Sequence, residues 1–309
     1  MSVQEQTVRL GRVAEAEQGN RLDRWLVLQK PEYSRMQYKE LIEAGKVWVN
    51  GKVAKKSCVL TQGDTVELKA LPEPRDFLPA PNAALKLELL YEDKDLLAVN
   101  KVAGMPCFPL RQDQNTTLAN ALMARFSELG CFKKNKREAG LLNRLDVGTS
   151  GIVLVARNEA SLAKLKELQK QGAIEKYYLA LCEGEVKAPQ QIALRLKTNP
   201  KNKSKMMVCG EFEPKDQKRS TSIYDVQSLG QNSLVKLRIH RGQRHQIRAH
   251  MAAIGHPLVN DPLYGAQAKP SMKGYRLHCE KVIFSSALSE KKIEIHATLS
   301  NWRIAKFGK

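Results

Sequence analysis

The spacing of apolar residues near the start of the chain predicts two short helices. One runs over residues 21–29, and the other begins after Ser34, a typical N-cap, and ends at Gly45. The apolar residues at helical spacing are Leu22, Trp25 and Leu26 in the first helix and Tyr38, Leu41 and Ile42 in the second. Each predicted helix therefore has one face to bury.

Short strand patterns follow these helices. Val47–Val49 is a β-branched and aromatic run, and the Asn50-Gly51 pair directly after it is the strongest short signal for a hairpin. Residues 63–68 supply a Gly-Asp turn and another strand. We therefore predict a self-contained unit over residues 18–70, built from two helices and a small sheet.

A proline-rich stretch separates this unit from a longer domain. Pro72, Pro74, Pro79 and Pro81 fall within ten residues, a density that excludes a helix or a central strand. Residues 71–84 are therefore predicted to form a semi-rigid linker. The remaining residues, 85–309, are assigned to the second domain.

In the second domain, predicted strands outnumber predicted helices. Helices are expected over 118–129 and 159–171, with Gly172 ending the latter. Strands are expected over residues 85–91, 96–100, 151–156, 177–182, 222–227 and 234–240. Because these strands do not alternate regularly with helices, we predict an α+β domain with a mixed, largely antiparallel sheet rather than a doubly wound one.

The charge balance narrows the choice of partner. Fifty-one Lys and Arg against 32 Asp and Glu leave a net charge of +19, spread along the chain, which attracts polyanions such as nucleic acid. An anionic membrane surface is the rival partner, but no basic amphipathic helix with a large aromatic face and no apolar run near 20 residues is found. Residues 1–17 lack an apolar stretch for secretion, so we expect a cytoplasmic protein without a membrane partner.

The cysteines and histidines do not predict a metal site. Six cysteines lie far apart without a Cys-x-x-Cys pair, which indicates reduced thiols rather than a disulfide framework or a zinc knuckle. His240, His245 and His250 repeat every five residues, so they do not share one helical face. We predict no bound metal.

Residues 141–151 place a carboxylate on an irregular loop. Asp146 stands between apolar segments, beside Arg144 and a Thr-Ser-Gly turn that leads into a strand. Catalytic groups tend to lie on such loops, and a buried carboxylate needs a cation or several donors, both of which are near in sequence. From the residues alone, a catalytic Asp and a turn-forming or capping Asp are equally open.

The first unit resembles the small RNA-binding domain named after ribosomal small-subunit protein S-four. The matching segments are Arg21-Leu22-Asp23, Ser34-Arg35, Ile42-x-x-Gly45-x-Val47-x-Val49-Asn50-Gly51 and Gly63-Asp64. In that family the second helix and nearby loops carry basic residues onto structured RNA. The resemblance implies RNA contacts from Arg35, Lys39, Lys46, Lys52, Lys55 and Lys56, and the alternative is an ordinary solvated helix face.

The second domain resembles the RluA-type pseudouridine synthases. The run Arg-Leu-Asp-x-x-Thr-Ser-Gly at 144–151 matches their signature. Four further segments match in the same order: Val99-Asn100-Lys101 with Gly104 and Pro106, Lys176-x-Tyr178-x-Ala180 with Gly184, His245–Met251, and Gly255–Gly265. Val102 departs from the usual Pro, and Asn143 stands where His is common, so no imidazole acts at that place.

The resemblance implies an isomerase that converts uridine to pseudouridine within RNA and uses no cofactor. Asp146 would attack the ribose or take a proton from the sugar, two routes that the sequence leaves open. Arg248 would pair with Asp146 through its flat guanidinium fork, and Asp261 is interpreted as a loop-shaping residue. Tyr178 would stack on the extruded base, while Arg144 would help to fill the space that the base leaves.

Basic stretches surround these motifs. Residues 230–260 hold five Lys or Arg and no acid, and Arg241 and Arg244 are our candidates for RNA contact. Residues 195–219 hold eight basic against three acidic residues, where solvated loops are the alternative.

Three classes of function follow from these patterns. An RNA-binding head on an RluA-type body is the arrangement of family members that modify large-subunit ribosomal RNA, so we expect that substrate and a monomeric enzyme; transfer RNA is the alternative. A non-catalytic RNA-binding protein conflicts with the intact motif around Asp146. A metal-dependent ribonuclease using His240, His245 and Asp261 lacks clustered carboxylates.

Overall fold

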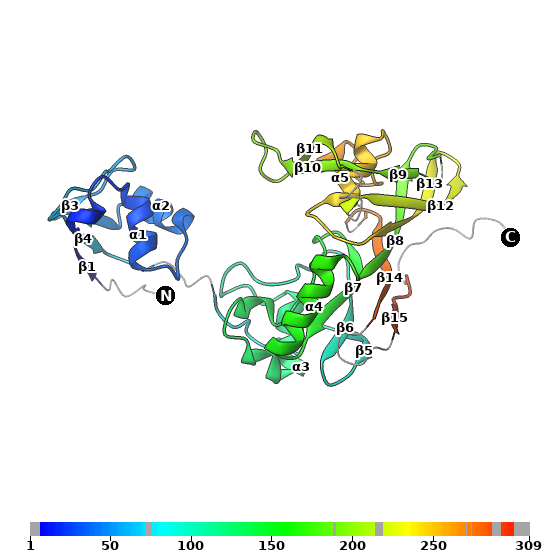
Figure 1. Ribbon diagram of the computed structural model, residues 1–309, viewed down its shortest axis with the longest axis horizontal. Helices are drawn as coiled ribbons and strands as arrows, with labels where there is room; N and C mark the ends of the chain where they lie inside the picture. The colour runs from blue at the N-terminus through cyan, green and yellow to red at the C-terminus, as the bar shows by residue number, and fades with distance from the viewer. Residues whose placement is uncertain are drawn as a thin grey trace. The chain divides into compact units, whose positions relative to one another are not determined.

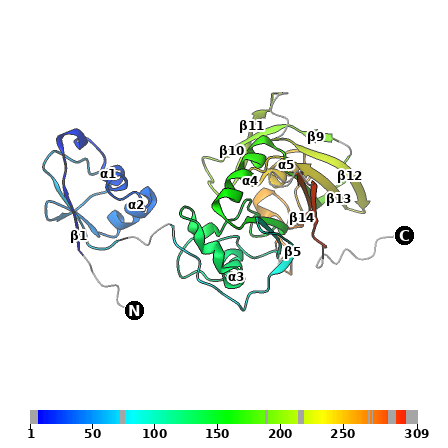
Figure 2. The same ribbon diagram turned by 60° about the horizontal axis from the view of Figure 1, so that its bottom comes forward.

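The computed structural model describes residues 7–71, 76–187, 190–213, 219–269, 271–272, 274–285 and 292–299. The chain divides into two compact units at Phe77, and the short segment Leu110–Asp113 groups with the first. Figures 1 and 2 show the elements of each unit. Pro72 and Pro74 of the predicted linker lie outside the described residues, and the boundaries at 70 and 84 remain predictions.

The first unit packs two helices against a four-stranded antiparallel sheet of order β1-β4-β2-β3. Its elements are β1 Val8–Arg12, α1 Leu22–Gln29, α2 Arg35–Glu43, β2 Val47–Val49, β3 Lys52–Val53 and β4 Thr65–Leu68. The two helices and the Asn50-Gly51 hairpin lie where the sequence predicts them. Strand β1 was not predicted; its Val8 and Leu10 pack against the core of the unit, and the strand pairs with β4.

Local chemistry explains these elements. The Ser34 hydroxyl accepts a hydrogen bond from the Gln37 amide, 3.0 Å, and the Gln37 side chain accepts one from the Ser34 amide, 2.9 Å, which forms a capping box. Asn50 and Gly51 have φ values of 50° and 73°, the left-handed conformations that a two-residue hairpin of this type requires. The buried side chains of the unit, such as Trp25 and Tyr38, come from the predicted helix faces.

The second unit is built on a nine-stranded mixed sheet. Its path runs β5-β6-β7-β14-β8-β13-β12-β9, and β15 pairs with β14. The strands are β5 Glu88–Glu92, β6 Leu96–Lys101, β7 Ser150–Ala156, β8 Glu175–Glu183, β9 Gln190–Ile192, β12 Thr221–Leu229, β13 Asn232–Ile239, β14 Leu277–Ser285 and β15 Lys292–His296. Among the described strands only β7 and β14 pair in parallel, so the predicted α+β class with a largely antiparallel sheet is confirmed.

Helices and a hairpin complete this unit. They are α3 Leu118–Arg125, α4 Glu159–Gln171, α5 Gln246–Ala253 and a separate two-stranded sheet of β10 Leu194–Thr198 and β11 Met206–Glu211. The helix predicted over 118–129 ends at Arg125 and gives way to a 3-10 turn, Ser127–Cys131. No helix among the described residues is long and apolar enough to cross a bilayer.

The parallel pair of strands brings distant loops together. The register joins Ser150 of β7 to His278 of β14, so the residues that precede the two strands lie at one end of the sheet. Asp146 precedes β7 and Tyr275 precedes β14. Pairing of the sheet therefore sets up a site from residues far apart in the sequence.

Candidate active site

The loop that carries Asp146 is fixed by hydrogen bonds on both sides of it. The buried Asn143 side chain accepts a hydrogen bond from the Leu154 amide, 2.9 Å, and the Leu145 amide donates to the Cys107 sulfur, 3.3 Å. After Asp146, the Thr149 amide donates to the Asp146 carbonyl, 3.0 Å, and closes a turn. Asn143, which departs from the family pattern, therefore serves to hold the loop against β7.

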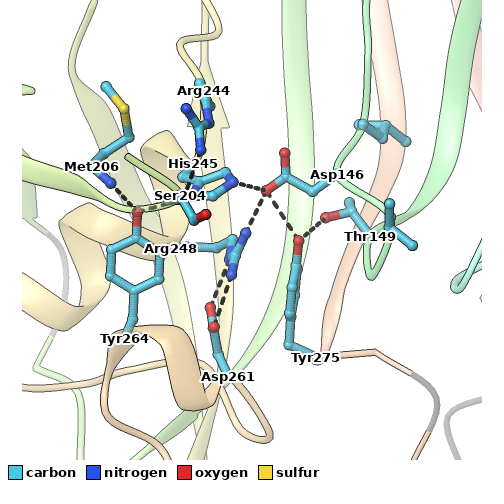
Figure 3. A network of polar contacts seen from close by, with 12 residues as sticks. Asp146, Thr149, Ser204, Met206, Arg244, His245, Arg248, Asp261, Tyr264 and Tyr275 are labelled. Atoms are coloured by element: carbon cyan, nitrogen blue, oxygen red, sulfur yellow. Dashed lines mark hydrogen bonds and ion pairs between the residues drawn. The ribbon is translucent and has the colours of Figure 1, made fainter. Parts of the chain in front are cut away.

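One oxygen of Asp146 receives all the contacts that this carboxylate makes within the described residues. Oδ2 accepts hydrogen bonds from Nη1 of Arg248, 2.9 Å, and from the hydroxyl of Tyr275, 3.0 Å, and lies 3.7 Å from Nε2 of His245 (Figure 3). The side chain of Asp146 is 28% exposed. Oδ1 is thus the carboxylate oxygen that is available to a substrate.

Arg248 divides its guanidinium between two carboxylates. Nε and Nη2 donate to the two oxygens of Asp261 at 2.7 and 2.9 Å, and Nη1 alone reaches Asp146. The guanidinium carbon lies 4.1 Å from the ring centre of Tyr275 and 5.1 Å from that of Tyr264. Burial acts to lower the pKa of Arg248, but the hydrogen bonds that it donates to Asp261 and the nearby negative groups outweigh burial and raise this pKa above its ordinary value.

This arrangement adds a side-chain contact to the sequence-based interpretation of Asp261 as a loop-shaping residue, whose carbonyl accepts hydrogen bonds from the Tyr264 and Ala266 amides. The flat fork of Arg248 grips Asp261 and not Asp146, so the predicted pairing of Arg248 with Asp146 rests on a single N–H. Asp261 is fully buried and has both oxygens engaged. Asp261 therefore anchors Arg248, because a buried guanidinium is stabilised by a two-pronged pairing with a carboxylate.

Tyr275 is a site residue that sequence analysis missed. A side chain at Gly148 would meet the Tyr275 ring at 2.8 Å, and one at Gly274 would meet the Gly148 carbonyl oxygen at 2.5 Å. Glycine at these two places therefore lets the loop before β14 close on the loop after Asp146. No local sequence pattern predicts this contact, because Gly148 and Tyr275 are far apart in the sequence and are brought together only by the pairing of β7 with β14.

His245 sits at the start of α5 in an unusual conformation. Its φ of 54° is left-handed, which a residue with a side chain rarely adopts. Its Nδ1 lies 3.0 Å from the Tyr264 hydroxyl, which also accepts a hydrogen bond from the Met206 amide, 2.9 Å. Burial lowers the pKa of His245 below its ordinary value.

Comparisons with known proteins decide the family. The family described as RNA pseudouridylate synthase matches residues 95–253, more than half of the chain, and the S4 domain matches residues 20–66. An uncharacterised RNA pseudouridine synthase of Synechocystis is 33% identical over 285 residues, 90% of this chain and 85% of its own length. The chain belongs to the RluA-type RNA pseudouridine synthases.

Other relatives agree with this membership. The ribosomal large subunit pseudouridine synthase D of Yersinia pestis is 32% identical over 259 residues, 84% of this chain and 77% of its own length. The solved structure of human RNA pseudouridylate synthase domain containing 1 has the same fold, with a TM-score of 0.56 and 24% identity over 71% of this chain and 86% of its own. This synthase is therefore an isomerase with an N-terminal RNA-binding domain.

Tyr178, predicted to stack on the base, lies in the core of the synthase. It is 5% exposed on β8, and burial raises the pKa of its hydroxyl well above the ordinary value, with Cys279 beside it. Tyr177 alternates to the other face of the strand, as expected. The stacking role of Tyr178 stays a prediction, and Tyr275 is the tyrosine whose hydroxyl bonds Asp146.

The other residues predicted to contact RNA are spread over both units. Arg144 is exposed, with its guanidinium 5.6 Å from the ring centre of Phe108, and Arg244 donates to the Ser204 carbonyl at 2.7 Å. The buried Nε of Arg241 has no hydrogen-bond partner among the described residues. In the S4 domain, Arg35 and Lys39 pair with the buried Asp23 at 2.9 and 3.7 Å, Lys46 is half-buried, and Lys52, Lys55 and Lys56 are exposed.

Lys101 is a buried cation behind the active-site loop. Its ammonium donates to the carbonyl oxygens of Val102 and Met105 at 3.0 and 2.8 Å and to that of Val147 at 3.4 Å. Burial lowers the pKa of Lys101 to about 8. Because Val147 follows Asp146, this lysine ties the motif at 99–106 to the turn that carries the carboxylate.

The residues named for a metal-dependent nuclease do not form a ligand set. In the part of the chain that the structure describes, no group of three His, Cys, Asp or Glu side chains is arranged to hold a metal ion. Asp261 gives both oxygens to Arg248 instead. The arrangement suits a reaction in which one oxygen of a carboxylate acts while the other is held.

Proposed function

We propose that this synthase isomerises uridines of large-subunit ribosomal RNA, as a monomer in the cytoplasm. The relative named ribosomal large subunit pseudouridine synthase D supports this class of RNA, and the S4 domain and the net charge of +19 suit a large structured polyanion. The cysteines, all six in described segments, are free thiols, which accords with a reducing compartment. Transfer RNA is the competing substrate.

The single observation that carries the catalytic proposal is the unequal use of the two Asp146 oxygens. Arg248 and Tyr275 hold Oδ2, which orients the carboxylate and stabilises its negative charge. Oδ1 then faces the substrate as nucleophile towards ribose carbon 1′ or as base towards the sugar. The bond from carbon 1′ to nitrogen 1 breaks, the base turns, and carbon 5 bonds to carbon 1′; in the nucleophilic route this displaces Oδ1. Carbon 5 then loses its proton and nitrogen 1 takes one up, so the composition of the RNA is unchanged.

Several protein side chains are assigned to contact the RNA once the uridine has been extruded. Taking the base out of its stack costs a few kcal/mol. We assign Arg144, exposed beside the Phe108 ring, to the space that the base leaves, and Tyr178 to stacking under the base. Arg241 and Arg244, on the loop before α5, are assigned to nearby phosphates.

Asp146→Asn tests the reaction. The amide keeps the size of the side chain but is neither a nucleophile nor a base, so release of tritium from uridine labelled at carbon 5 should fall by more than about 1,000-fold, with RNA affinity unchanged. Asp225→Asn, the same change at an exposed ion pair on β12, is the matched control. Activity of Asp146→Asn within tenfold of the parent contradicts the assignment.

The substrate is tested separately from the reaction. Pseudouridine mapping of total RNA with and without the gene should show loss at one or more uridines of large-subunit ribosomal RNA. Loss confined to transfer RNA contradicts the proposed substrate and leaves the reaction intact. Labelled transcripts of both RNA classes, offered to the purified enzyme, give the same distinction in solution.

A further inference from the structure

The β10–β11 hairpin is hydrogen-bonded to helix α5 and to the residues just before it. Gln243 donates to the Leu196 carbonyl at 3.0 Å, Arg244 donates to the Ser204 carbonyl at 2.7 Å, and Nε2 of His250 lies 2.8 Å from the Leu194 carbonyl. Helix α5 carries Arg248, the cation on Asp146. These hydrogen bonds join the hairpin directly to the elements that carry Arg248.

The loop at the end of this hairpin is basic. Lys201 and Lys203 are exposed between β10 and β11, and the ammonium of Lys205 lies 5.2 Å from the ring centre of Tyr264. The chemistry of this loop fits phosphate groups of a polyanion. These lysines lie at one end of a series of contacts that continues through β11 towards Asp146.

That chain of contacts runs through two side chains to Asp146. The Met206 amide of β11 donates to the Tyr264 hydroxyl oxygen at 2.9 Å, and this hydroxyl lies 3.0 Å from Nδ1 of His245. Nε2 of His245 faces Oδ2 of Asp146 at 3.7 Å. Figure 3 shows these side chains in sequence from Met206 to Asp146.

Hydrogen-bond accounting fixes the direction of each contact. If Nδ1 of His245 carried the proton, the Tyr264 oxygen would accept twice and its own hydrogen would find no acceptor among the described residues. Nε2 would then present a lone pair to a carboxylate, which is repulsive. For the neutral imidazole, which burial favours by lowering the pKa of His245, this accounting assigns the Tyr264 hydrogen to Nδ1 and the ring N–H to Nε2, facing Asp146.

The backbone of His245 supports a function for this arrangement. A left-handed conformation at a residue with a side chain is disfavoured and persists where surrounding contacts determine it. Here the conformation places the ring between Tyr264, with which it makes an edge contact at 5.8 Å between centres, and Asp146.

We propose that Tyr264 and His245 are positioning residues that couple the β10–β11 hairpin to the catalytic carboxylate. When RNA phosphates engage the hairpin lysines, β11 presses Tyr264 towards His245, and Nε2–H closes from 3.7 Å to hydrogen-bond distance on Oδ2 of Asp146. Oδ2 then has three donors and Oδ1 is aimed at the ribose. The inference rests on the proposed function, since it concerns the same carboxylate.

The tautomer of His245 is tested directly in the full-length enzyme. Nitrogen-15 NMR of histidine-labelled protein, with the His245 signals identified by their loss in His245→Gln, should show Nε2 protonated and Nδ1 unprotonated. Tyr264→Phe removes the donor to Nδ1 and should shift this pattern towards a mixture of tautomers. A protonated Nδ1 in the parent enzyme overturns the proposal.

Kinetics test the coupling. Tyr264→Phe and His245→Gln should each lower the single-turnover rate at saturating large-subunit ribosomal RNA by about tenfold, with the dissociation constant of RNA changed less than twofold. The double variant should be no slower than the slower single variant, because both changes break one chain of contacts. Additive losses, or losses confined to affinity, overturn the proposal.

The controls separate this inference from the proposed function. Tyr224→Phe on β12 and His296→Gln on β15 make the same chemical changes at exposed places and should leave the rate unchanged. Inactivity of Asp146→Asn with full activity of Tyr264→Phe and His245→Gln refutes only the coupling. Activity of Asp146→Asn refutes the proposed function itself.

Discussion

Arg248 gives its two-pronged contact to Asp261 and a single N–H to Asp146. The fully buried Asp261 thus fixes the plane of the guanidinium, and Nη1 is left in one position for Oδ2 of Asp146. A rigid arginine can hold one oxygen firmly while the other stays free to react. We therefore expect Asp261 to act on the reaction through the orientation of Arg248.

Asp261→Asn should reduce turnover because it removes the anchor of Arg248. The amide replaces one of the two acceptor oxygens with an NH2 donor that faces an N–H of Arg248, so we expect the guanidinium to turn and Nη1 to leave Asp146. We expect the single-turnover rate to fall by about 10- to 100-fold and RNA affinity to stay the same. The unfolding free energy should drop by about 3 kcal/mol, since a buried charge loses its partner. A folded variant with parental rates would contradict the anchoring role.

Arg248→Lys tests whether shape matters beyond charge. Lysine offers a compact ammonium that cannot contact Asp261 at two points and Asp146 at a third. Single-turnover rates at saturating enzyme should fall by about 100-fold, and raising the pH should not restore them, because the defect is orientation. Arg238→Lys, on the β13 surface beside Glu175, is the matched control. Near-normal rates with weakened binding at high salt would make Arg248 a phosphate contact instead.

Tyr275→Phe removes one donor from Asp146 and leaves the ring against Arg248. The hydroxyl donates to Oδ2 at 3.0 Å, so its loss should lower the single-turnover rate by about tenfold with little change in stability or RNA affinity. Tyr91→Phe, at a hydroxyl bonded to Asp93 far from the loop, provides the comparison. Equal rates in the two variants would show that Tyr275 does not support the carboxylate.

Local sequence patterns were enough to predict the parts of the fold that depend on local chemistry. The capping box at Ser34 and the hairpin at Asn50-Gly51 are formed by residues within a few positions of each other, so both can be predicted from the sequence alone. The same holds for α4, which Asn158 caps and Gly172 ends. Strand β1 was missed because its alternating pattern has only two apolar residues, Val8 and Leu10, which is too short to predict a strand without its pairing with β4.

The site was predictable only where a motif carried it. Asp146 and Arg248 were singled out from motifs, and the structure brings them within 2.9 Å. The contacts of Tyr275 and Asp261 depend on the register of the sheet and on how closely two loops approach each other. Neither can be predicted from motifs that are separated along the sequence. The sequence alone predicts a loop-shaping role for Asp261, because no nearby residue indicates that helix α5 brings the Arg248 guanidinium to its side chain.

Lys101 should leave a pH signature on stability. Its pKa is about 8 in the folded protein and near 10.5 ordinarily, so between these values the unfolded chain binds more protons than the folded one. Unfolding free energy should therefore rise with pH across this window, by up to about 3 kcal/mol. Urea unfolding of the parent and of Lys101→Met at pH 7 and pH 10 isolates the effect. A difference between the two proteins that stays constant with pH would contradict the shift.

The S4 domain offers the last test, at a carboxylate that gathers three cations. Arg21, Arg35 and Lys39 surround the buried Asp23 at 3.2, 2.9 and 3.7 Å, so one negative charge fixes the place of three positive ones and leaves a surplus facing outward. A preordered surplus of this kind suits phosphates, since little side-chain entropy is lost on binding.

Changing Arg35 and Lys39 together to Gln should therefore weaken binding to large-subunit ribosomal RNA and flatten its salt dependence. Each lost phosphate contact should reduce the slope of log K against log salt by about 1. Single-turnover rates at saturating RNA should hold, because Asp146 is untouched. The control removes the same two kinds of charge elsewhere on the first unit, as Arg9→Gln with Lys30→Gln, whose partners are Glu67 and Glu32. Equal slopes for the two double variants would mean that the domain attracts RNA through net charge alone, and that the Asp23 cluster does not form the RNA contact.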